Sequence, residues 1–123
     1  MNHIELFAGC GGLSLGLESV GFKLVMANEL SPMAAETFAY NFFNEDLEKL
    51  NNKKSKVKWL SSKFTNEDIR SRLREDPRTF PELNEGQSDL DDHSDLSGKL
   101  IIGNIVQLNK WLEKHPFQVN DLS

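Results

Sequence analysis

Glycines cluster near the amino terminus, in the run Gly9-Cys10-Gly11-Gly12 between an apolar segment and a segment with helical spacing. Glycines at a strand-to-helix turn let the backbone bend tightly and approach a ligand closely. The N–H groups at the start of the helix favour negative or polar ligand groups. The run therefore predicts a site for a nucleotide-like cofactor, although a bare glycine pattern is about as common in ordinary tight turns.

Glu29 is the second residue whose position suggests chemistry, because it comes at the end of a predicted strand and follows Gly9 by about 20 residues. An acidic side chain at that point accepts hydrogen bonds from ribose hydroxyls. Taken alone, Glu29 is better explained as a solvated carboxylate, or as a partner for a helix that begins at Ser31. Combined with the glycine run, its position favours ribose binding.

The glycine pattern leaves two classes of cofactor open. A dinucleotide fingerprint requires Gly-x-Gly-x-x-Gly, and Ser14 stands where its third glycine should be. S-adenosylmethionine also carries an adenosine with free ribose hydroxyls, and its methionine carboxylate suits the start of a helix. The fit to a dinucleotide is imperfect, and physical chemistry alone admits both cofactors.

The segments around these residues alternate between strands and helices. Strands are predicted at His3–Phe7, Lys23–Ala27 and Leu100–Ile102, and helices over 13–20, 31–41, 65–74 and 105–115. Ser31 and Pro32 are typical of a helix start, while Leu13, Leu17 and Val20 share a helical face that should be buried. The alternation predicts an α/β fold with a parallel sheet, right-handed crossovers and flanking helices.

The middle of the chain, from about residue 45 to 98, is polar and carries most of the charge, so we interpret it as a surface insert. Thr65-Asn66-Glu67-Asp68 matches the pattern of a capped helix start. Residues 84–98 are acidic and poor in apolar side chains, which predicts a mobile loop. The four aspartates in this segment are interpreted as a solvated charge run rather than a cation site; they are Asp89, Asp91, Asp92 and Asp95.

Composition excludes several classes of protein. The 123 residues suit one domain at most, and the net charge of −5 argues against this segment gripping a nucleic acid by itself. Cys10 is the only cysteine and the three histidines are scattered, so neither an intrachain disulfide nor a metal site is expected. Because there is no membrane-spanning apolar run and no secretory signal, we expect a cytoplasmic location without a membrane partner.

The segment from Glu5 to Gly16, ELFAGCGGLSLG, closely resembles the opening motif of the DNA cytosine-5 methyltransferases, and the match is more specific than the glycines alone. The continuation from Gly16 to Leu30 is similar to the family as well, as is Gly103-Asn104-Ile105 where the family has Gly-Asp-Ile. The tail from Phe117 to Ser123 resembles the strand that leads into the family's catalytic loop. The resemblance implies a Rossmann-like S-adenosylmethionine-dependent methyltransferase fold, truncated before that loop.

The resemblance also implies S-adenosyl-L-methionine as the cofactor and assigns residues to it. The implied cofactor-binding residues are Phe7, Ala8, Gly9, Cys10, Gly11, Gly12, Glu29, Leu30, Asn104 and Ile105. Phe7 would pack near the adenine or the methionine part, the glycine run would line the methionine, and Glu29 would hold the ribose hydroxyls. Leu30 and Ile105 would pack on the adenine, with Asn104 facing its amino group. Asn104 replaces the family's aspartate, which gives up a charge-assisted bond, and it is equally well explained as a helix N-cap.

The resemblance places the chemistry itself outside this chain. In the family, a cysteine in a Pro-Cys loop attacks a flipped-out cytosine, and the cofactor's methyl group passes to carbon 5 of the base. This chain has no Pro-Cys pair, so the nucleophile is expected beyond Ser123, and Cys10 is not assigned that role. Residues 1–123 would then be the amino-terminal, cofactor-binding part of a restriction–modification methyltransferase, inactive alone, with DNA bound by other parts of the protein.

Two other functions stay open on the sequence. One is a non-catalytic subunit of a split methyltransferase that only binds S-adenosylmethionine. The other is the dinucleotide-binding domain of an oxidoreductase, which Ser14 disfavours.

Overall fold

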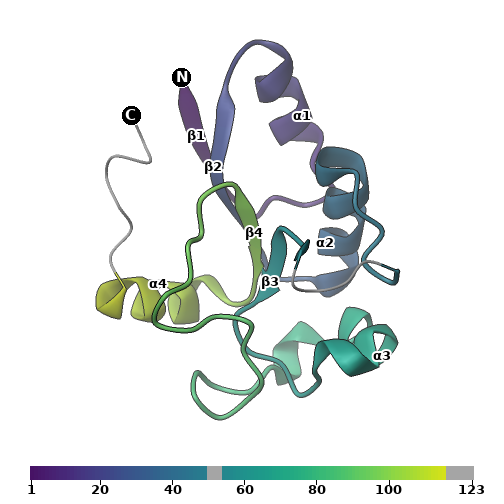
Figure 1. Ribbon diagram of the computed structural model, residues 1–123, viewed down its shortest axis with the longest axis vertical. Coiled ribbons are helices and arrows are strands. Elements are labelled where there is room, and N and C mark those ends of the chain that lie inside the picture. Colours follow the sequence, from purple (N-terminus) through teal and green to yellow (C-terminus); the bar gives the residue numbers. More distant parts are fainter. Residues whose placement is uncertain (50–53, 116–123) are drawn as a thin grey trace.

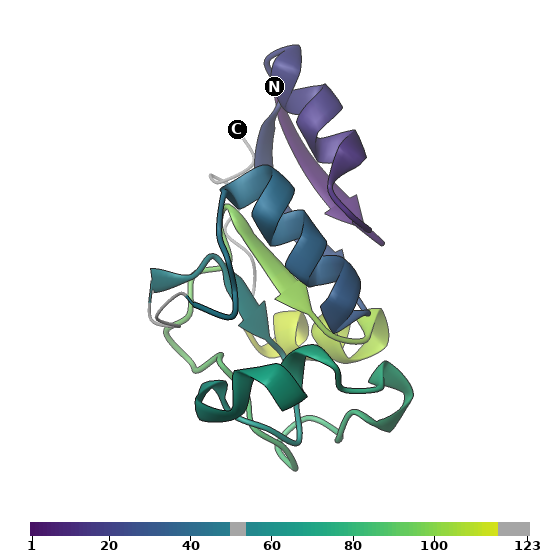
Figure 2. The same cartoon turned by 90° about the vertical axis from the view of Figure 1, so that its right-hand side faces the viewer.

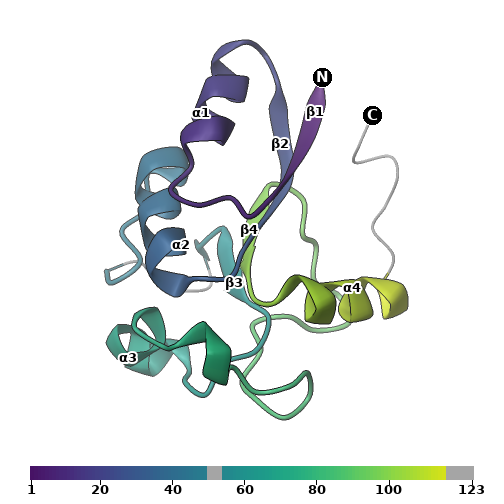
Figure 3. The ribbon, with the colours of Figure 1, turned by 180° about the vertical axis from the view of Figure 1, so that it is seen from behind.

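A four-stranded parallel sheet organises the part of the chain that the structure, a computed structural model, describes, which is residues 1–49 and 54–115. The strand order is β1 (Asn2–Leu6), β2 (Lys23–Glu29), β4 (Lys99–Ile102) and β3 (Val57–Trp59). Helices α1 (Gly12–Ser19) and α2 (Pro32–Phe38) lie on one face, and α4 (Ile105–Lys114) lies on the other (Figures 1 and 3). The predicted α/β fold with a parallel sheet is confirmed.

The helix that follows β2 begins and ends at residues whose chemistry explains its limits. The Ser31 hydroxyl accepts a hydrogen bond from the Ala34 N–H, and Pro32 occupies the first turn, as predicted. The helix continues past Phe38 as a π-helical turn, Ala39–Phe43, and stops where Asn44 adopts a left-handed φ of 58°. This helix crosses the sheet in front of β2 and β4 (Figure 2).

Apolar side chains fill both faces of the sheet. The face under α2 is packed around Phe38, Trp59 and Ile102, all almost completely buried. The opposite face is packed around Met26, Ile101 and Leu108 of α4. Strand β4 therefore contributes alternate residues to two core layers, as expected for a parallel strand that is covered on both sides.

The β1–α1 unit differs from the sequence prediction. Leu13 and Val20 are 63% and 70% exposed, so the predicted apolar face of this helix is not buried by the described residues. Ser14 is buried instead, and its hydroxyl donates a hydrogen bond to the Glu5 carboxylate on β1. Burial raises the pKa of Glu5. Ile4 on β1 is also 47% exposed, because β1 is an edge strand whose only described neighbour is β2.

The polar middle of the chain is more structured than predicted. This part of the chain supplies β3 to the sheet. Its acidic segment pairs with the residues that follow β3, through an antiparallel bridge between Ser62 and Gln87. The interpretation of the four aspartates as a solvated run is wrong for Asp89. Its carboxylate lies 2.9 Å from an Nη atom of Arg72, which is fully buried and 4.4 Å above the Trp59 ring.

The helix predicted over 65–74 is present in a shorter form. A short helix, α3 (Ile69–Leu73), follows a 3-10 turn at Asn66–Asp68, but the Thr65 side chain makes no capping hydrogen bond. The tail from Phe117 to Ser123, which resembles the strand before the family's catalytic loop, lies outside the described residues. Within the described ranges, no helix has the length and apolar character needed to cross a bilayer.

Candidate cofactor site

The glycine loop joins β1 to α1 through three left-handed residues. Phe7, Gly9 and Gly11 have φ values of 57°, 59° and 93°. A left-handed φ is uncommon for a bulky residue and is a form of local strain that concentrates at ligand sites. Phe7 is also 73% exposed at the carboxyl end of β1, where a ligand could cover it. A Cβ at Gly9 or Gly12 would enter open space, so the loop leaves room for a ligand to approach the backbone.

Contacts from β2 and the helix that follows it hold the glycine loop in place. The Ala8 N–H donates to the Asn28 carbonyl at 3.0 Å, and the Asn41 side-chain amide donates to the Cys10 carbonyl at 3.1 Å. Gly11 packs so closely on the helix that a Cβ there would lie 3.3 Å from the Phe38 ring. The loop is therefore preorganised rather than dependent on a ligand for its shape.

The Glu29 carboxylate connects the glycine loop to the start of α2. One carboxylate oxygen accepts the Gly9 N–H at 2.8 Å, and the other accepts the Ser31 N–H at 2.7 Å. A carboxylate oxygen has two lone pairs, so each retains capacity for a further donor. Glu29 is only partly buried. Glu29 can therefore be both a partner for the helix that begins at Ser31 and a ribose acceptor. While it accepts the Ser31 N–H, its two carboxylate oxygens still have lone pairs available for a pair of hydroxyls.

The carboxyl ends of β2 and β4 are clamped together by Asn28. This buried side chain donates to the carbonyls of Ile101 and Gly103, at 3.0 and 3.1 Å, while the Gly103 N–H donates to the Glu29 carbonyl. The clamp brings Leu30, which directly follows β2, close to Asn104, which directly follows β4. Residues at the carboxyl ends of parallel strands form the usual ligand edge of such sheets.

A pocket of about 280 Å³ lies at this edge. Leu30, Gly103 and Asn104 line one side of it, and residues from the polar middle of the chain line the other. The Asn104 amide oxygen also accepts the Val106 N–H at 2.7 Å and so caps α4. Ile105 is not among the lining residues and packs against the Met26 and Ile101 core layer.

The structure brings most of the predicted site residues to one edge of the sheet. Those in the glycine loop are adjacent to Glu29, and Glu29 is adjacent to the pocket at Leu30. Sequence reasoning missed Asn41 and the lining residues Leu60, Phe80 and Pro81. The sequence does contain a signal for Phe80 and Pro81. They form an apolar pair within a polar stretch, and such a pair indicates that a packing partner lies elsewhere in the fold.

The single cysteine and the candidate metal-binding side chains can be located in the described part of the chain. Cys10 is exposed in the glycine loop, where its backbone carbonyl accepts the hydrogen bond from the Asn41 side chain. Residues 1–49 and 54–115 contain no group of three or more histidine, cysteine or acidic side chains placed to hold a metal ion. What this site offers a ligand is hydrogen-bonding groups and a pocket lined by both apolar and polar side chains.

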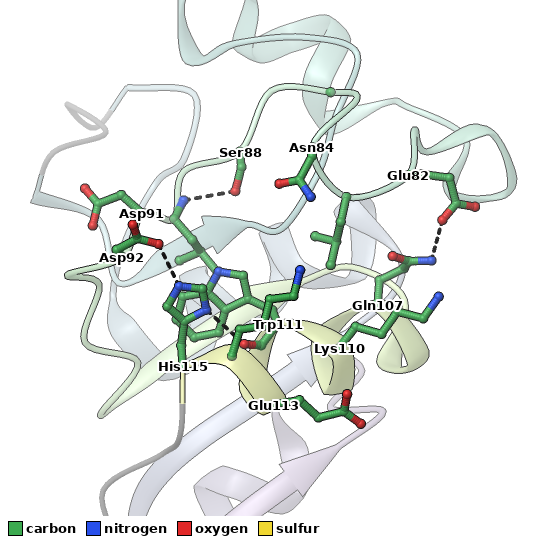
Figure 4. Close-up of a pocket in the computed structure, with 14 residues that line it drawn as sticks. Glu82, Asn84, Ser88, Asp91, Asp92, Gln107, Lys110, Trp111, Glu113 and His115 are labelled. Carbon is green, nitrogen blue, oxygen red and sulfur yellow. Dashed lines mark hydrogen bonds and ion pairs between the residues drawn. The ribbon is translucent and has the colours of Figure 1, made fainter.

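A second cavity, of about 830 Å³, lies beside α4 and the acidic segment (Figure 4). The Trp111 ring stacks on His115 at a centroid distance of 4.1 Å. Nδ1 of His115 lies 2.9 Å from the Trp111 carbonyl, and Nε2 lies 2.8 Å from an Asp92 carboxylate oxygen. Because both partners only accept hydrogen bonds, the doubly protonated imidazolium is favoured, and the pKa of His115 is raised, chiefly by Asp92.

The His115–Asp92 pair should make stability depend on pH. A raised histidine pKa adds stability that is fully present below the unfolded value of about 6.5 and is lost as pH rises through the folded pKa. We therefore expect Asp92→Asn to destabilise the protein most below about pH 6.5, with a smaller difference at higher pH. Urea unfolding of both forms across this range checks it, and a difference that grows with pH would contradict it.

Comparisons with known proteins match the amino-terminal part of the chain. The family model of the C-5 cytosine-specific DNA methylases matches residues 1–70. The chain is similar to the type II methyltransferase M.PspPI of Psychrobacter sp., with 46% identity over 50 residues that make up 37% of this chain and 12% of that protein. It is also similar to M.HindV of Haemophilus influenzae, with 40% identity over 65 residues, or 50% of this chain and 21% of the relative.

A third relative is similar to this chain over a larger share of its own length. M.HgiGI of Herpetosiphon aurantiacus, again a type II methyltransferase, is 46% identical over 44 residues, which are 36% of this chain and 35% of that protein. The chain thus matches a small part of the length of these curated relatives. No solved structure matches it significantly.

Proposed function

The chain belongs to the family of C-5 cytosine-specific DNA methylases, and we propose on that basis that it binds S-adenosyl-L-methionine as the cofactor segment of a DNA (cytosine-5-)-methyltransferase. The observation that carries this proposal is the position of Glu29. Its carboxylate joins the glycine loop at Gly9 to the helix start at Ser31, and the next residue, Leu30, lines the pocket. A loop, an acceptor pair and a pocket follow one another along a single edge.

The order of these features corresponds to the order of the cofactor's parts. The methionine portion would lie against the glycine loop, from Phe7 through Gly12, where open space borders Gly9 and Gly12. The ribose would lie at Glu29, which accepts its two hydroxyls on the free lone pairs. The adenine would enter the pocket at Leu30 and Asn104. Bound in this way, the cofactor supplies a methyl group carried on a sulfonium.

Asn104 and Ile105 take more limited roles in this proposal. The Asn104 amide oxygen already accepts the Val106 N–H, and its second lone pair would accept from the adenine amino group. Ile105 supports the pocket from the core beneath it. Both residues follow β4, so the Asn28 clamp positions them relative to Leu30.

The whole protein's reaction and its partner are part of the proposal. The relatives named above are type II methyltransferases, so we propose methylation of cytosine at carbon 5 in DNA, within a restriction–modification system. The net charge of −5 implies that DNA is bound by residues outside this chain, and the proposed nucleophile lies outside it too. Residues 1–123 would form the amino-terminal part of the catalytic domain, with an insert at about 45–98.

Transfer of labelled methyl groups tests this function. The intact protein, given S-adenosylmethionine with a labelled methyl group and DNA, is expected to label cytosine at carbon 5. Residues 1–123 alone are expected to label nothing, because Cys10 is their only cysteine and it lies in the cofactor loop. Labelling by this segment alone would overturn the assignment of the nucleophile to another part of the protein. Absence of labelling by the intact protein on DNA of varied sequence would overturn the reaction.

A further inference from the structure

The pocket at the edge of the sheet has two walls of different origin. Leu30, Gly103 and Asn104 form the wall at the strand ends. Phe80 and Pro81 belong to the second wall, which comes from the polar middle of the chain. A segment that reads as a surface addition is therefore in contact with the same space as the residues after β2 and β4.

The wall containing Phe80 and Pro81 is held firmly. The Ser61 hydroxyl donates to the Glu82 carbonyl at 3.3 Å, and the Gln107 amide donates to the Glu82 carboxylate at 2.5 Å (Figure 4). A Cβ on Gly86 would lie only 2.2 Å from Cγ of Pro81, so this glycine permits a close backbone approach behind the wall. Phe80 packs against the core layer of α2 as well. A wall fixed in this way has a defined shape before any ligand binds.

The size and lining of the pocket suit one flat heteroaromatic ring. Its volume of about 280 Å³ is at the lower limit for a complete small-molecule site, so it would hold one end of a larger ligand. Apolar side chains such as Leu30 and Phe80 can cover the faces of a ring. The polar lining residues can contact its edge; they are Ser61, Arg78, Glu82, Asn104 and Gln107. With the ribose at Glu29, a purine joined to it would enter from the Leu30 side. Its far edge, which bears the amino group that donates to Asn104, would then also face Phe80 and Pro81.

We propose that Phe80 and Pro81 close the purine end of the cofactor site and determine which purines it accepts. The inserted segment is then part of the binding site and not only an addition to the surface. This inference rests on the proposed function, because it takes the ribose position at Glu29 as its starting point. It adds a specificity role for two residues that lie outside the glycine loop and the strand ends.

Binding of two ligands to the intact protein tests this role by calorimetry. One ligand is S-adenosylhomocysteine, and the other is its derivative with a benzyl group on the purine amino nitrogen. The unaltered protein is expected to reject the benzyl derivative strongly. Phe80→Ala should reduce the preference for the unmodified purine by about tenfold or more, since removing a wall relieves the clash. Phe64→Ala, at a half-buried phenylalanine that does not line the pocket, should leave the preference unchanged.

Two further arms keep the outcomes separate. Phe80→Leu retains an apolar side chain for the core and should shift the preference in the same direction but less, which covers the case in which Phe80→Ala fails to fold. If the unaltered protein binds S-adenosylhomocysteine and neither Phe80 variant changes the preference, the role of this wall is refuted while the proposed function stands. If the unaltered protein binds neither ligand, the proposed function fails and this inference falls with it.

Discussion

Replacing Asp89 with alanine is expected to lower the free energy of unfolding by about 3–5 kcal/mol, because it leaves the buried Arg72 guanidinium without its counter-ion. Arg72 is fully buried, and the Asp89 side chain is only 9% exposed. The same carboxylate also accepts hydrogen bonds from the Trp59 N–H and the Asn66 amide. Burial lowers the pKa of Arg72 and the neighbouring Asp89 opposes that shift, so the pair depends on both partners.

Denaturant unfolding of the intact protein measures this effect, and Trp59 provides a fluorescent reporter 4.4 Å from the guanidinium. Glu85→Ala, at an exposed position in the same segment, serves as the matched control and should change stability by less than about 0.5 kcal/mol. The double change Arg72→Met with Asp89→Leu should recover part of the loss, because it removes both charges together but leaves the Trp59 N–H without its acceptor. A loss below about 1 kcal/mol in Asp89→Ala, similar to that of the control, would show that the ion pair is not a structural centre.

Replacing Glu29 with alanine is expected to weaken the binding of S-adenosylhomocysteine to the intact protein by roughly tenfold to a hundredfold. The reason is the loss of hydrogen bonds to a charged acceptor, about 1.5–3 kcal/mol, where each 1.4 kcal/mol is a factor of about ten. The change also frees the N–H groups of Gly9 and Ser31, so the glycine loop loses its link to the helix start. The lost hydrogen bonds and the loosened loop both weaken the binding of S-adenosylhomocysteine.

The Glu29 result needs a control for folding, which Glu36→Ala provides. Glu36 is a carboxylate on α2 that pairs with the half-exposed Arg74. Its replacement by alanine should leave the affinity for S-adenosylhomocysteine unchanged. Thermal melting of both variants without ligand separates a loss of binding from a loss of structure. Unchanged affinity in Glu29→Ala would remove Glu29 from the ribose role.

The parts of the fold that sequence reasoning predicted depend on local signals. Ser31-Pro32 starts a helix through contacts within four residues, and the glycine run turns the chain through its own backbone freedom. Strand β4 was recognised because Leu100, Ile101 and Ile102 form an apolar run buried on both faces. For the same reason the spacing of Glu29 from Gly9 was informative, since a strand and a helix of ordinary length separate them.

The parts that were missed depend on contacts between distant residues. Asp89 is predicted to be solvated because carboxylates are seldom fully buried, and only its pairing with Arg72 across the inserted segment makes burial tolerable. Ser14 takes the buried position on α1 because Glu5 lies opposite it on β1. The contribution of Phe80 to the pocket likewise requires the insert to fold back toward Leu30. Local sequence patterns do not predict these contacts between distant residues.

We propose that the glycine loop and Glu29 form a site for S-adenosylmethionine. Calorimetric titration of the intact protein with S-adenosylhomocysteine and, separately, with NAD tests it most directly, because both ligands carry an adenosine with the free ribose hydroxyls that we propose Glu29 binds. We expect S-adenosylhomocysteine to bind and NAD to bind far more weakly or not at all, because Ser14 occupies the position of the third glycine in a dinucleotide loop. Preferential binding of NAD would contradict the claim.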